Sequence, residues 1–201
     1  MKFLFQVISY IFHPIFAPIA GTVAYFLTTP KYSPLDLQSG NILPIFILTV
    51  IIPIIAYLIL RNLGAADTIF LNSVSERKYP LIIHIILLVL ILIKVIPNNY
   101  ITELYFYFVG LLGAAISCLF LLYFNFKTSL HVVGVAGILM YLINLSIHFE
   151  INIIIAIGLM TLIIGLVASS RLYLRAHSKL EILAGICIGL LSQLLTVKFW
   201  L

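Results

Sequence analysis

The chain has 201 residues, of which 64% are hydrophobic and only 8% are charged. A soluble globular domain carries about 25% charged residues, so this composition excludes a soluble fold and predicts an all-α, multi-pass membrane protein forming one domain over residues 1–201. The net charge of +5 fits anionic lipid headgroups or an anionic substrate, and no basic tract with interleaved aromatic residues indicates a nucleic-acid partner.

Seven apolar runs follow one another along the chain. A helix that crosses the hydrocarbon core of a bilayer needs about 20 residues. The runs are Phe3–Thr28, Ile42–Leu60, Leu81–Ile96, Leu104–Phe124, Val132–Ile147, Ile151–Ala168 and Ile182–Val197. The third, fifth and seventh runs are short, so the sequence predicts a bundle of six to seven spans, in which flanking residues lengthen the short ones.

The N-terminal run and the two cysteines do not change this class. The run Phe3–Thr28 is longer than the apolar region of a typical secretory signal, and His13-Pro14 and Pro18 interrupt it, so we interpret it as a membrane helix. Cys118 and Cys187 lie in separate apolar runs, where they form neither a metal motif nor a disulfide framework.

Three of the segments between the runs carry most of the basic residues. They are Asn62–Pro80, Asn125–His131 and Ser170–Glu181. Two spans separate each of these segments from the next, so all three emerge on the same face of the membrane. We call this face the polar end, and we expect the functional site there.

The segment Ser170–Glu181 has the residue types of a reactive site. Glu181 follows His177 by four residues, so on a helix the carboxylate can accept a proton from one imidazole nitrogen and leave the other free to react. Arg171 and Arg175 have the same spacing and would form a two-pronged anion clamp, to which Ser170 adds a hydroxyl donor. The plainer alternative is that these cations only anchor the chain at the lipid headgroups.

The three segments, in this order, resemble the motifs of the type-2 phosphatidic acid phosphatase and haloperoxidase superfamily. The third motif of that family is Ser-Arg, five residues, His, three residues and Asp. Here it reads Ser170-Arg171, five residues, His177, three residues and Glu181. The second motif, Pro-Ser-Gly-His, corresponds to Thr128-Ser129-Leu130-His131, which keeps Ser and His but not Pro and Gly. The basic first motif ending in Arg-Pro corresponds to Glu76-Arg77-Lys78-Tyr79-Pro80, in which Tyr79 stands in place of the arginine.

The second motif also looks like that of a membrane-bound bacterial branch of the superfamily. In that branch it tends to read Lys, one residue, Ser, one residue and His, followed by a Gly-rich helix. Here these positions are Lys127, Ser129 and His131, with Gly134 and Gly137 in the following run. The resemblance covers about Arg77 to Gly189 and implies a protein of the bacterial inner membrane.

The resemblance implies phosphoryl transfer without a metal or a cofactor. His177 would attack phosphorus and form a phosphohistidine, Glu181 would orient the imidazole, and His131 would protonate the leaving oxygen and then activate water. The implied phosphate ligands are Arg171, Ser129, Ser170, Arg77, Lys78 and Arg175. Residues expected to line the site are Lys127, Leu130, whose backbone amide would replace that of a glycine, and His84, an ionisable residue inside an apolar run near the polar end.

The sequence therefore predicts a lipid phosphatase whose partners are a phosphorylated membrane lipid and the bilayer. Phosphatidic acid, phosphatidylglycerol phosphate, polyprenyl diphosphate and lipid A are all candidate substrates. The alternative is a degenerate family member that binds or transports a phosphorylated lipid without hydrolysing it. The side of the membrane that the site faces stays open, because the excess of Lys and Arg at the polar end disappears when the candidate site cations are left out. Small residues in several runs leave a homo-oligomer open as well.

Overall fold

The computed structural model describes residues 1–64, 74–97 and 101–200, and this part of the chain is helical without a β-strand. The α-helices are α1 (Lys2–Ile11), α2 (Ala17–Thr28), α3 (Leu35–Phe46), α4 (Ile52–Asn62), α5 (Val74–Leu90), α6 (Thr102–Tyr123), α7 (Leu130–His148), α8 (Ile154–Tyr173) and α9 (Lys179–Val197). Three short elements complete them, namely the 3₁₀ turn Pro14–Phe16 between α1 and α2, and π-helical turns at Ile47–Ile51 and Ile91–Val95.

Seven segments in the described part of the chain are long and apolar enough to cross a membrane. They are Lys2–Thr28, Leu35–Asn62, Glu76–Val95, Thr102–Tyr123, Leu130–His148, Ile154–Tyr173 and Lys179–Val197. The all-α fold class is confirmed, and these helices fit a multi-pass integral membrane protein. Flanking polar residues lengthen the third, fifth and seventh runs, as expected.

Two helix starts differ from the expectation. The loop expected from Thr29 to Asn41 is shorter, because α3 already begins at Leu35, where the proline before it fixes an extended backbone. The basic residues Arg77 and Lys78 lie within α5, and Pro80 does not end that helix. A proline removes one backbone hydrogen bond, and membrane helices tolerate this when neighbouring helices support them. Residues 65–73 of the expected loop lie outside the described residues.

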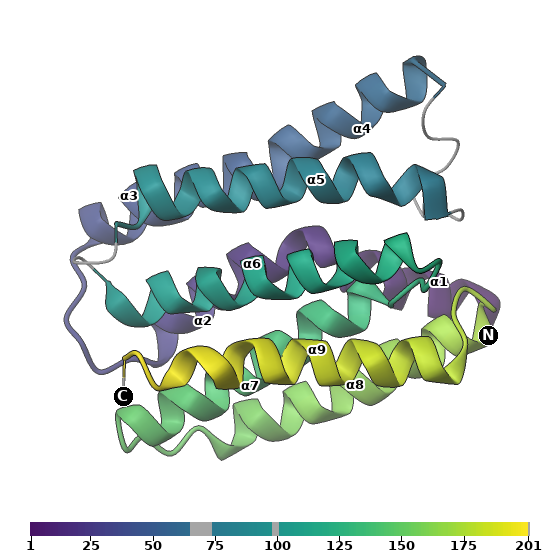
Figure 1. Cartoon of the computed structure of the whole chain (residues 1–201). Coiled ribbons are helices and arrows are strands. Elements are labelled where there is room, and N and C mark those ends of the chain that lie inside the picture. The colour runs from purple at the N-terminus through teal and green to yellow at the C-terminus, as the bar shows by residue number, and fades with distance from the viewer. Residues whose placement is uncertain (65–73, 98–100, 201) are drawn as a thin grey trace.

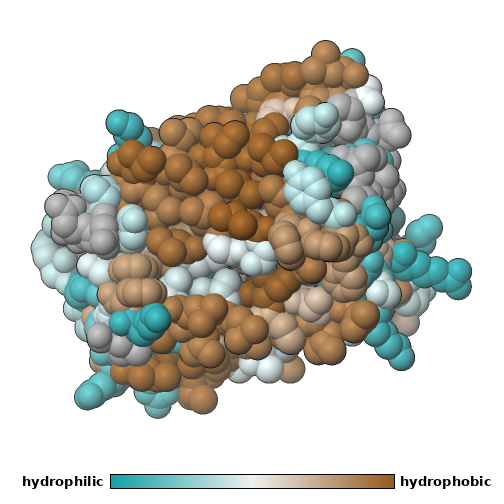
Figure 2. Space-filling model, in the orientation of Figure 1, coloured by the Kyte–Doolittle hydropathy of each residue, from teal (hydrophilic) through white to brown (hydrophobic). Residues whose placement is uncertain are grey.

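The helices run roughly side by side, and α7 lies behind α9 in the view of Figure 1. Helix α7 contacts α2, α6, α8 and α9, while α5 packs on α6 and α1 packs on α8. More residues are buried in α7 than in any other described helix. The middle of the face seen in Figure 2 is hydrophobic, and hydrophilic residues gather at its two ends, as expected for a bundle that crosses a bilayer.

Close packing of α7 against α9 depends on Gly189. A Cβ atom at this position would lie 2.5 Å from the carbonyl oxygen of Val133 and 2.8 Å from the Cβ of Ala136. Small residues let two membrane helices approach this closely. The absence of a side chain therefore sets the distance between α9 and the start of α7, where the polar end lies.

We expect Gly189→Ala to lower the melting temperature of the detergent-solubilised protein, because overpacking costs about 1–3 kcal/mol. Gly113→Ala on α6 is the matched control, since a Cβ there meets nothing within 4 Å. That control should be neutral or slightly stabilising, because alanine favours a helix over glycine by about 1 kcal/mol. Equal melting temperatures for the two variants would contradict the packing assigned to Gly189.

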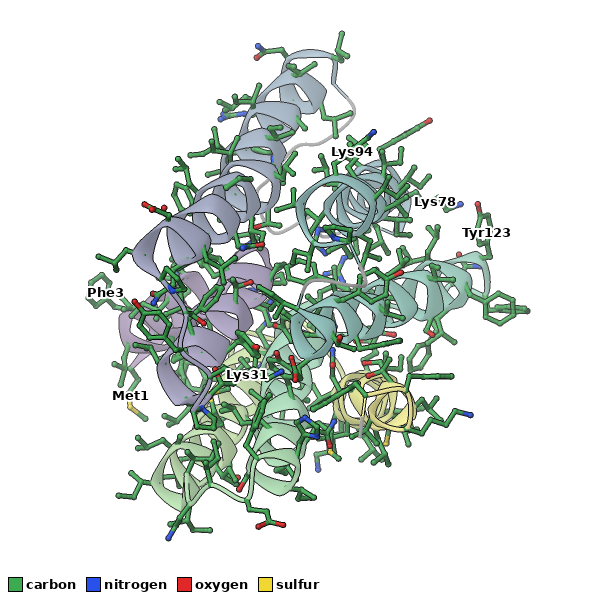
Figure 3. All side chains as sticks on the ribbon, turned by 90° about the vertical axis from the view of Figure 1, so that its left-hand side faces the viewer. Met1, Phe3, Lys31, Lys78, Lys94 and Tyr123 are labelled. Atoms are coloured by element: carbon green, nitrogen blue, oxygen red, sulfur yellow. The ribbon has the colours of Figure 1, made fainter. Side chains whose placement is uncertain are left out.

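A buried carboxylate, that of Glu103, contacts several helices at the end of the bundle opposite the polar end. Glu103 at the start of α6 is 3% exposed, forms an ion pair with Lys31, and accepts a hydrogen bond from the hydroxyl of Tyr25 at 3.2 Å. The Nε2 atom of His148 lies 3.5 Å from the same carboxylate. Figure 3 looks onto this end, with Lys31 lying among the helices. The α2–α3 connection is thus fixed to α6 and α7, far from the polar end.

Candidate functional site

The three basic segments meet at one end of the bundle, as the count of spans predicts. Arg77 on α5 donates from Nη1 to the carbonyl oxygen of Thr128 at 3.3 Å. The Nδ1 atom of His177 lies 3.0 Å from the carbonyl oxygen of Lys127. The backbone amide of Ser129 donates to the carbonyl oxygen of Glu181 at 3.4 Å. The α6–α7 connection therefore lies between the start of α5 and the α8–α9 connection, on the right in Figure 1.

The imidazole of His177 is held by two acceptors on one nitrogen. Its side chain is 1% exposed, and Nδ1 lies 3.1 Å from Oε2 of Glu181 as well as 3.0 Å from the carbonyl oxygen of Lys127. Neither a carbonyl nor a carboxylate can donate a hydrogen, so Nδ1 carries the proton. The Nε2 atom of neutral His177 then holds the lone pair.

Glu181 reaches His177 and also caps α9. Residue His177 precedes the helix, so the expected helical pairing of the two residues is wrong, although their contact forms. Ser178 is the N-cap of α9: its hydroxyl accepts from the amide of Glu181, and its own amide donates to Oε2 of Glu181 at 2.9 Å. This capping box presents the same carboxylate oxygen to the imidazole.

His177 lies outside the membrane-spanning segments, and burial lowers its pKa to about 4. The nearby charges of Arg77 and Arg171 contribute to this lowering of the pKa, while Glu181 opposes it. The pKa of Lys127 in the same region is lowered, by burial first and by the charge of Arg77 second. At neutral pH the imidazole of His177 is therefore uncharged and available as a nucleophile.

Arg175 does not share a helical face with Arg171, because α8 ends at Tyr173. The amide of Arg175 donates to the carbonyl oxygen of Leu172 and that of Ala176 to the carbonyl oxygen of Arg171, both at 3.0 Å. With a φ of 52° at Arg175 this is a Schellman turn, in which the residue after the C-cap takes the left-handed conformation. Arg171 stays buried at 2% exposure, whereas Arg175 is exposed.

The first helix, α1, reaches into the polar end through Ser9. The Ser9 side chain is fully buried, its carbonyl oxygen lies 3.2 Å from Nε2 of His131, and its hydroxyl accepts from Nη1 of Arg171 at 3.2 Å. The hydroxyls of Ser9 and Ser170 are 2.8 Å apart, and that of Ser170 also donates to the carbonyl oxygen of Phe5 at 2.7 Å. Sequence reasoning missed Ser9, whose only signal was a polar residue inside an apolar run.

His13 also belongs to this end of the molecule. Its ring lies 5.2 Å from that of His131 in an edge-to-face arrangement. Its side chain accepts a hydrogen bond from the amide of Ile15, so it caps the 3₁₀ turn that follows. The signal in the sequence was a histidine followed by a proline within an apolar run, which marks both a break in the helix and an ionisable group at membrane depth.

The other predicted ligands divide into those that face the site and those that do not. Arg77 is buried, and the hydroxyls of Thr128 and Ser129 are buried without a hydrogen-bond partner among the described residues. Lys78 instead points outward, with Nζ 5.2 Å from the ring centre of Tyr123, and both residues lie at the edge of the bundle in Figure 3.

Of two further predicted residues, Leu130 borders the site and His84 is not in contact with it among the described residues. Leu130 is the first residue of α7, and its side chain borders a small cavity beside Arg77. His84 lies on α5 and is half-buried, and within the described part of the chain no hydrogen bond or ring contact joins it to the site.

The site is closed in this conformation, because the side chain of His177 is 1% exposed. The cavity beside Arg77 has a volume of about 10 Å³ and is lined by Arg77, Leu81, Cys118, Leu122, Thr128 and Leu130. This is the space of about one water molecule. A phosphate group therefore needs side chains or a helix at the polar end to move before it can reach His177.

Comparisons with known protein families, sequences and structures found no relative of this chain. No protein-family model matches the chain, and neither the curated proteins nor the solved structures contain a match. The geometry of the polar end, and the motifs that it brings together, therefore carry the functional argument.

Proposed function

We propose that the polar end binds the phosphate group of a membrane lipid and hydrolyses it through a phosphohistidine at His177. The observation that carries this proposal is the pairing of Nδ1 of His177 with Glu181 and with the carbonyl oxygen of Lys127. This pairing fixes the tautomer in which Nε2 is the nucleophile, and the carboxylate balances the positive charge that the ring gains. The resemblance to the phosphatase superfamily supports the same reading.

The reaction has two steps. In the first, Nε2 of His177 forms a bond to phosphorus while the bond from phosphorus to the lipid oxygen breaks. We assign the proton that the leaving oxygen takes up to Nδ1 of His131, because Nε2 of that ring faces the carbonyl oxygen of Ser9. In the second step the oxygen of water forms a bond to phosphorus while the bond from phosphorus to Nε2 of His177 breaks, His131 accepts the proton of the water, and inorganic phosphate leaves.

Charge and hydrogen-bond donors at the polar end suit a phosphoryl group. The guanidinium groups of Arg77 and Arg171 are buried at the polar end, where Arg77 donates to the carbonyl oxygen of Thr128 and Arg171 to Ser9, and we assign them to the negative charge at the phosphorus. The hydroxyls of Thr128 and Ser129 are buried without partners among the described residues, and phosphate oxygens would accept hydrogen bonds from both. The start of α7, at Leu130, adds the positive end of a helix dipole.

The position of the site favours a lipid as the substrate. It lies at one end of a bundle whose middle is hydrophobic, and a bilayer around that middle would bring its headgroups to the site. We place the protein in the bacterial inner membrane on the strength of the family resemblance. Phosphatidic acid, phosphatidylglycerol phosphate, polyprenyl diphosphate and lipid A are the substrates to test.

A second candidate function is binding of a phosphorylated lipid without hydrolysis. The burial of His177 favours it, because a side chain that is 1% exposed leaves no open path for an in-line attack on phosphorus in the described conformation. Under this alternative the protein would retain a lipid phosphate through purification and release no inorganic phosphate from it.

The deciding experiment is a phosphate-release screen over the four lipid phosphates, with detergent-solubilised protein and His177→Ala as the control. We expect the wild-type protein to release phosphate from at least one lipid with EDTA present, because His177 rather than an ion supplies the nucleophile. Loss of activity on chelation, restored by a divalent cation, would contradict this mechanism. Retention of an unhydrolysed lipid phosphate would favour the binding protein.

The pH dependence of kcat/KM provides a separate check. Because burial lowers the pKa of His177 to about 4, the neutral, nucleophilic imidazole persists well below the ordinary histidine pKa of 6.5. We expect the acidic limb of the kcat/KM profile, which reports protonation of His177, to fall only as the pH approaches 4. A Glu181→Gln variant removes a group that raises this pKa, so its limb should move to lower pH, and a shift to higher pH would contradict the assignment.

A further inference from the structure

We propose that Ser9 on α1 is a positioning residue of the site, which holds the guanidinium of Arg171 in place for the phosphoryl group. The inference rests on the proposed function and extends the site beyond the three basic segments to the first helix. It starts from a chain of buried hydrogen bonds that joins α1 to α8.

The direction of donation along these hydrogen bonds follows from the number of protons that each hydroxyl carries. The hydroxyl of Ser170 has one proton, and a carbonyl can only accept, so that proton is donated to the carbonyl oxygen of Phe5 at 2.7 Å. Ser9 must then donate its own proton to Ser170 at 2.8 Å, and its oxygen accepts from Nη1 of Arg171 at 3.2 Å. Arg171 therefore donates to Ser9, Ser9 donates to Ser170, and Ser170 donates to the carbonyl oxygen of Phe5 in α1.

Burial makes this arrangement specific. Ser9 and Ser170 are fully buried and Arg171 is 2% exposed, so water cannot replace a missing partner at low cost. Ser9 is also the only buried residue of α1. The rest of that helix is held by apolar contacts such as the rings of Phe5 and Tyr173, whose centres are 4.5 Å apart.

The backbone of Ser9 acts on the second histidine at the same time. Its carbonyl oxygen lies 3.2 Å from Nε2 of His131 and can only accept, so Nε2 carries a proton. Nδ1 of His131 is then the nitrogen that gives up and takes up a proton during the reaction. One residue of α1 thus sets the orientation of a phosphate-binding arginine through its side chain and of the proposed general acid through its backbone. The side chain is the part that substitution can test.

The test uses Ser9→Ala and Ser9→Thr in the full-length, detergent-solubilised protein, and it measures kcat and the Ki of vanadate. Vanadate is an anion that mimics the phosphoryl group in the transition state. We expect Ser9→Ala to lower kcat and raise the Ki of vanadate by about tenfold each, because a misplaced side chain weakens stabilisation of the transition state. A misfolded fraction would lower kcat but leave the Ki unchanged. Ser9→Thr keeps the hydroxyl and should restore the Ki.

Thr22→Val is the matched control, because Thr22 is also fully buried and its hydroxyl donates to a single carbonyl oxygen, that of Pro18, within α2. This variant should leave the Ki of vanadate unchanged. If Ser9→Thr fails to fold, the comparison of Ser9→Ala with Thr22→Val still tests the positioning role.

An unchanged Ki of vanadate in Ser9→Ala would overturn the positioning role. A higher kcat in Ser9→Ala would overturn it too and would show that α1 obstructs the site. If the wild-type protein hydrolyses no lipid phosphate, the proposed function fails instead.

Discussion

Replacing His177 with alanine is expected to abolish phosphate release, with kcat falling by at least about 10³-fold. Alanine removes the atom that forms the bond to phosphorus, and water at the same place is a far weaker nucleophile. The side chain is 1% exposed, and its Nδ1 is held by the carboxylate of Glu181 and the carbonyl oxygen of Lys127. Neither of these acceptors can replace Nε2 as the nucleophile. Steady-state release of phosphate from the best lipid of the screen measures the effect.

His148→Gln is the control for this substitution. His148 is a histidine at the opposite end of the bundle, where Nε2 lies 3.5 Å from Glu103. Its replacement should leave kcat within about twofold, since glutamine can still donate to that carboxylate and the polar end is not touched. Retention of kcat within about tenfold in His177→Ala would remove His177 from the role of nucleophile.

Glu181→Gln is expected to lower kcat by about 10³-fold while the protein stays folded. The amide keeps the shape of the side chain, and its oxygen can still accept from the amide of Ser178, so the start of α9 is preserved. An amide carries no charge to balance the imidazolium-like ring that forms when Nε2 attacks phosphorus. The comparison of kcat with the melting temperature separates the chemical effect from a folding defect.

Ser178→Ala separates the two roles of Glu181. This variant removes the hydroxyl that accepts from the amide of Glu181, but it leaves the 3.1 Å contact between Glu181 and His177 in place. The loss of an N-cap should cost about 1 kcal/mol of stability and change kcat by less than about twofold. Equal losses of kcat in Ser178→Ala and Glu181→Gln would mean that Glu181 acts only as a cap.

The sequence was sufficient to predict those features that depend on composition and on order along the chain. The spans follow from the apolar runs, because a backbone in lipid must satisfy its own hydrogen bonds. The meeting of Arg77, Ser129 and His177 at one end follows from the even number of spans between their segments. The contact between His177 and Glu181 was predicted with the correct partners and reach, but on the wrong local structure.

The features that the sequence did not reveal depend on turns and on contacts between distant segments. Within the described residues, three turns have a non-glycine residue at positive φ, at Asn125, Glu150 and Arg175, so the usual glycine signal for the end of a helix is missing there. The turn at Arg175 removes the expected clamp with Arg171. The contacts of Ser9 with Ser170 and Arg171 join residues more than 160 positions apart, and no spacing along the chain indicates them.

The most direct measurement is the detection of a phosphoryl group on His177 during turnover. Wild-type protein is mixed with its best lipid phosphate, quenched rapidly in alkaline denaturant, and analysed by mass spectrometry of the peptide that contains His177. We predict one added phosphoryl group on that peptide, stable in alkali and lost in acid, and absent from His177→Ala. Turnover without any phosphoryl group on His177, or with the group on another residue, would contradict a phosphohistidine mechanism.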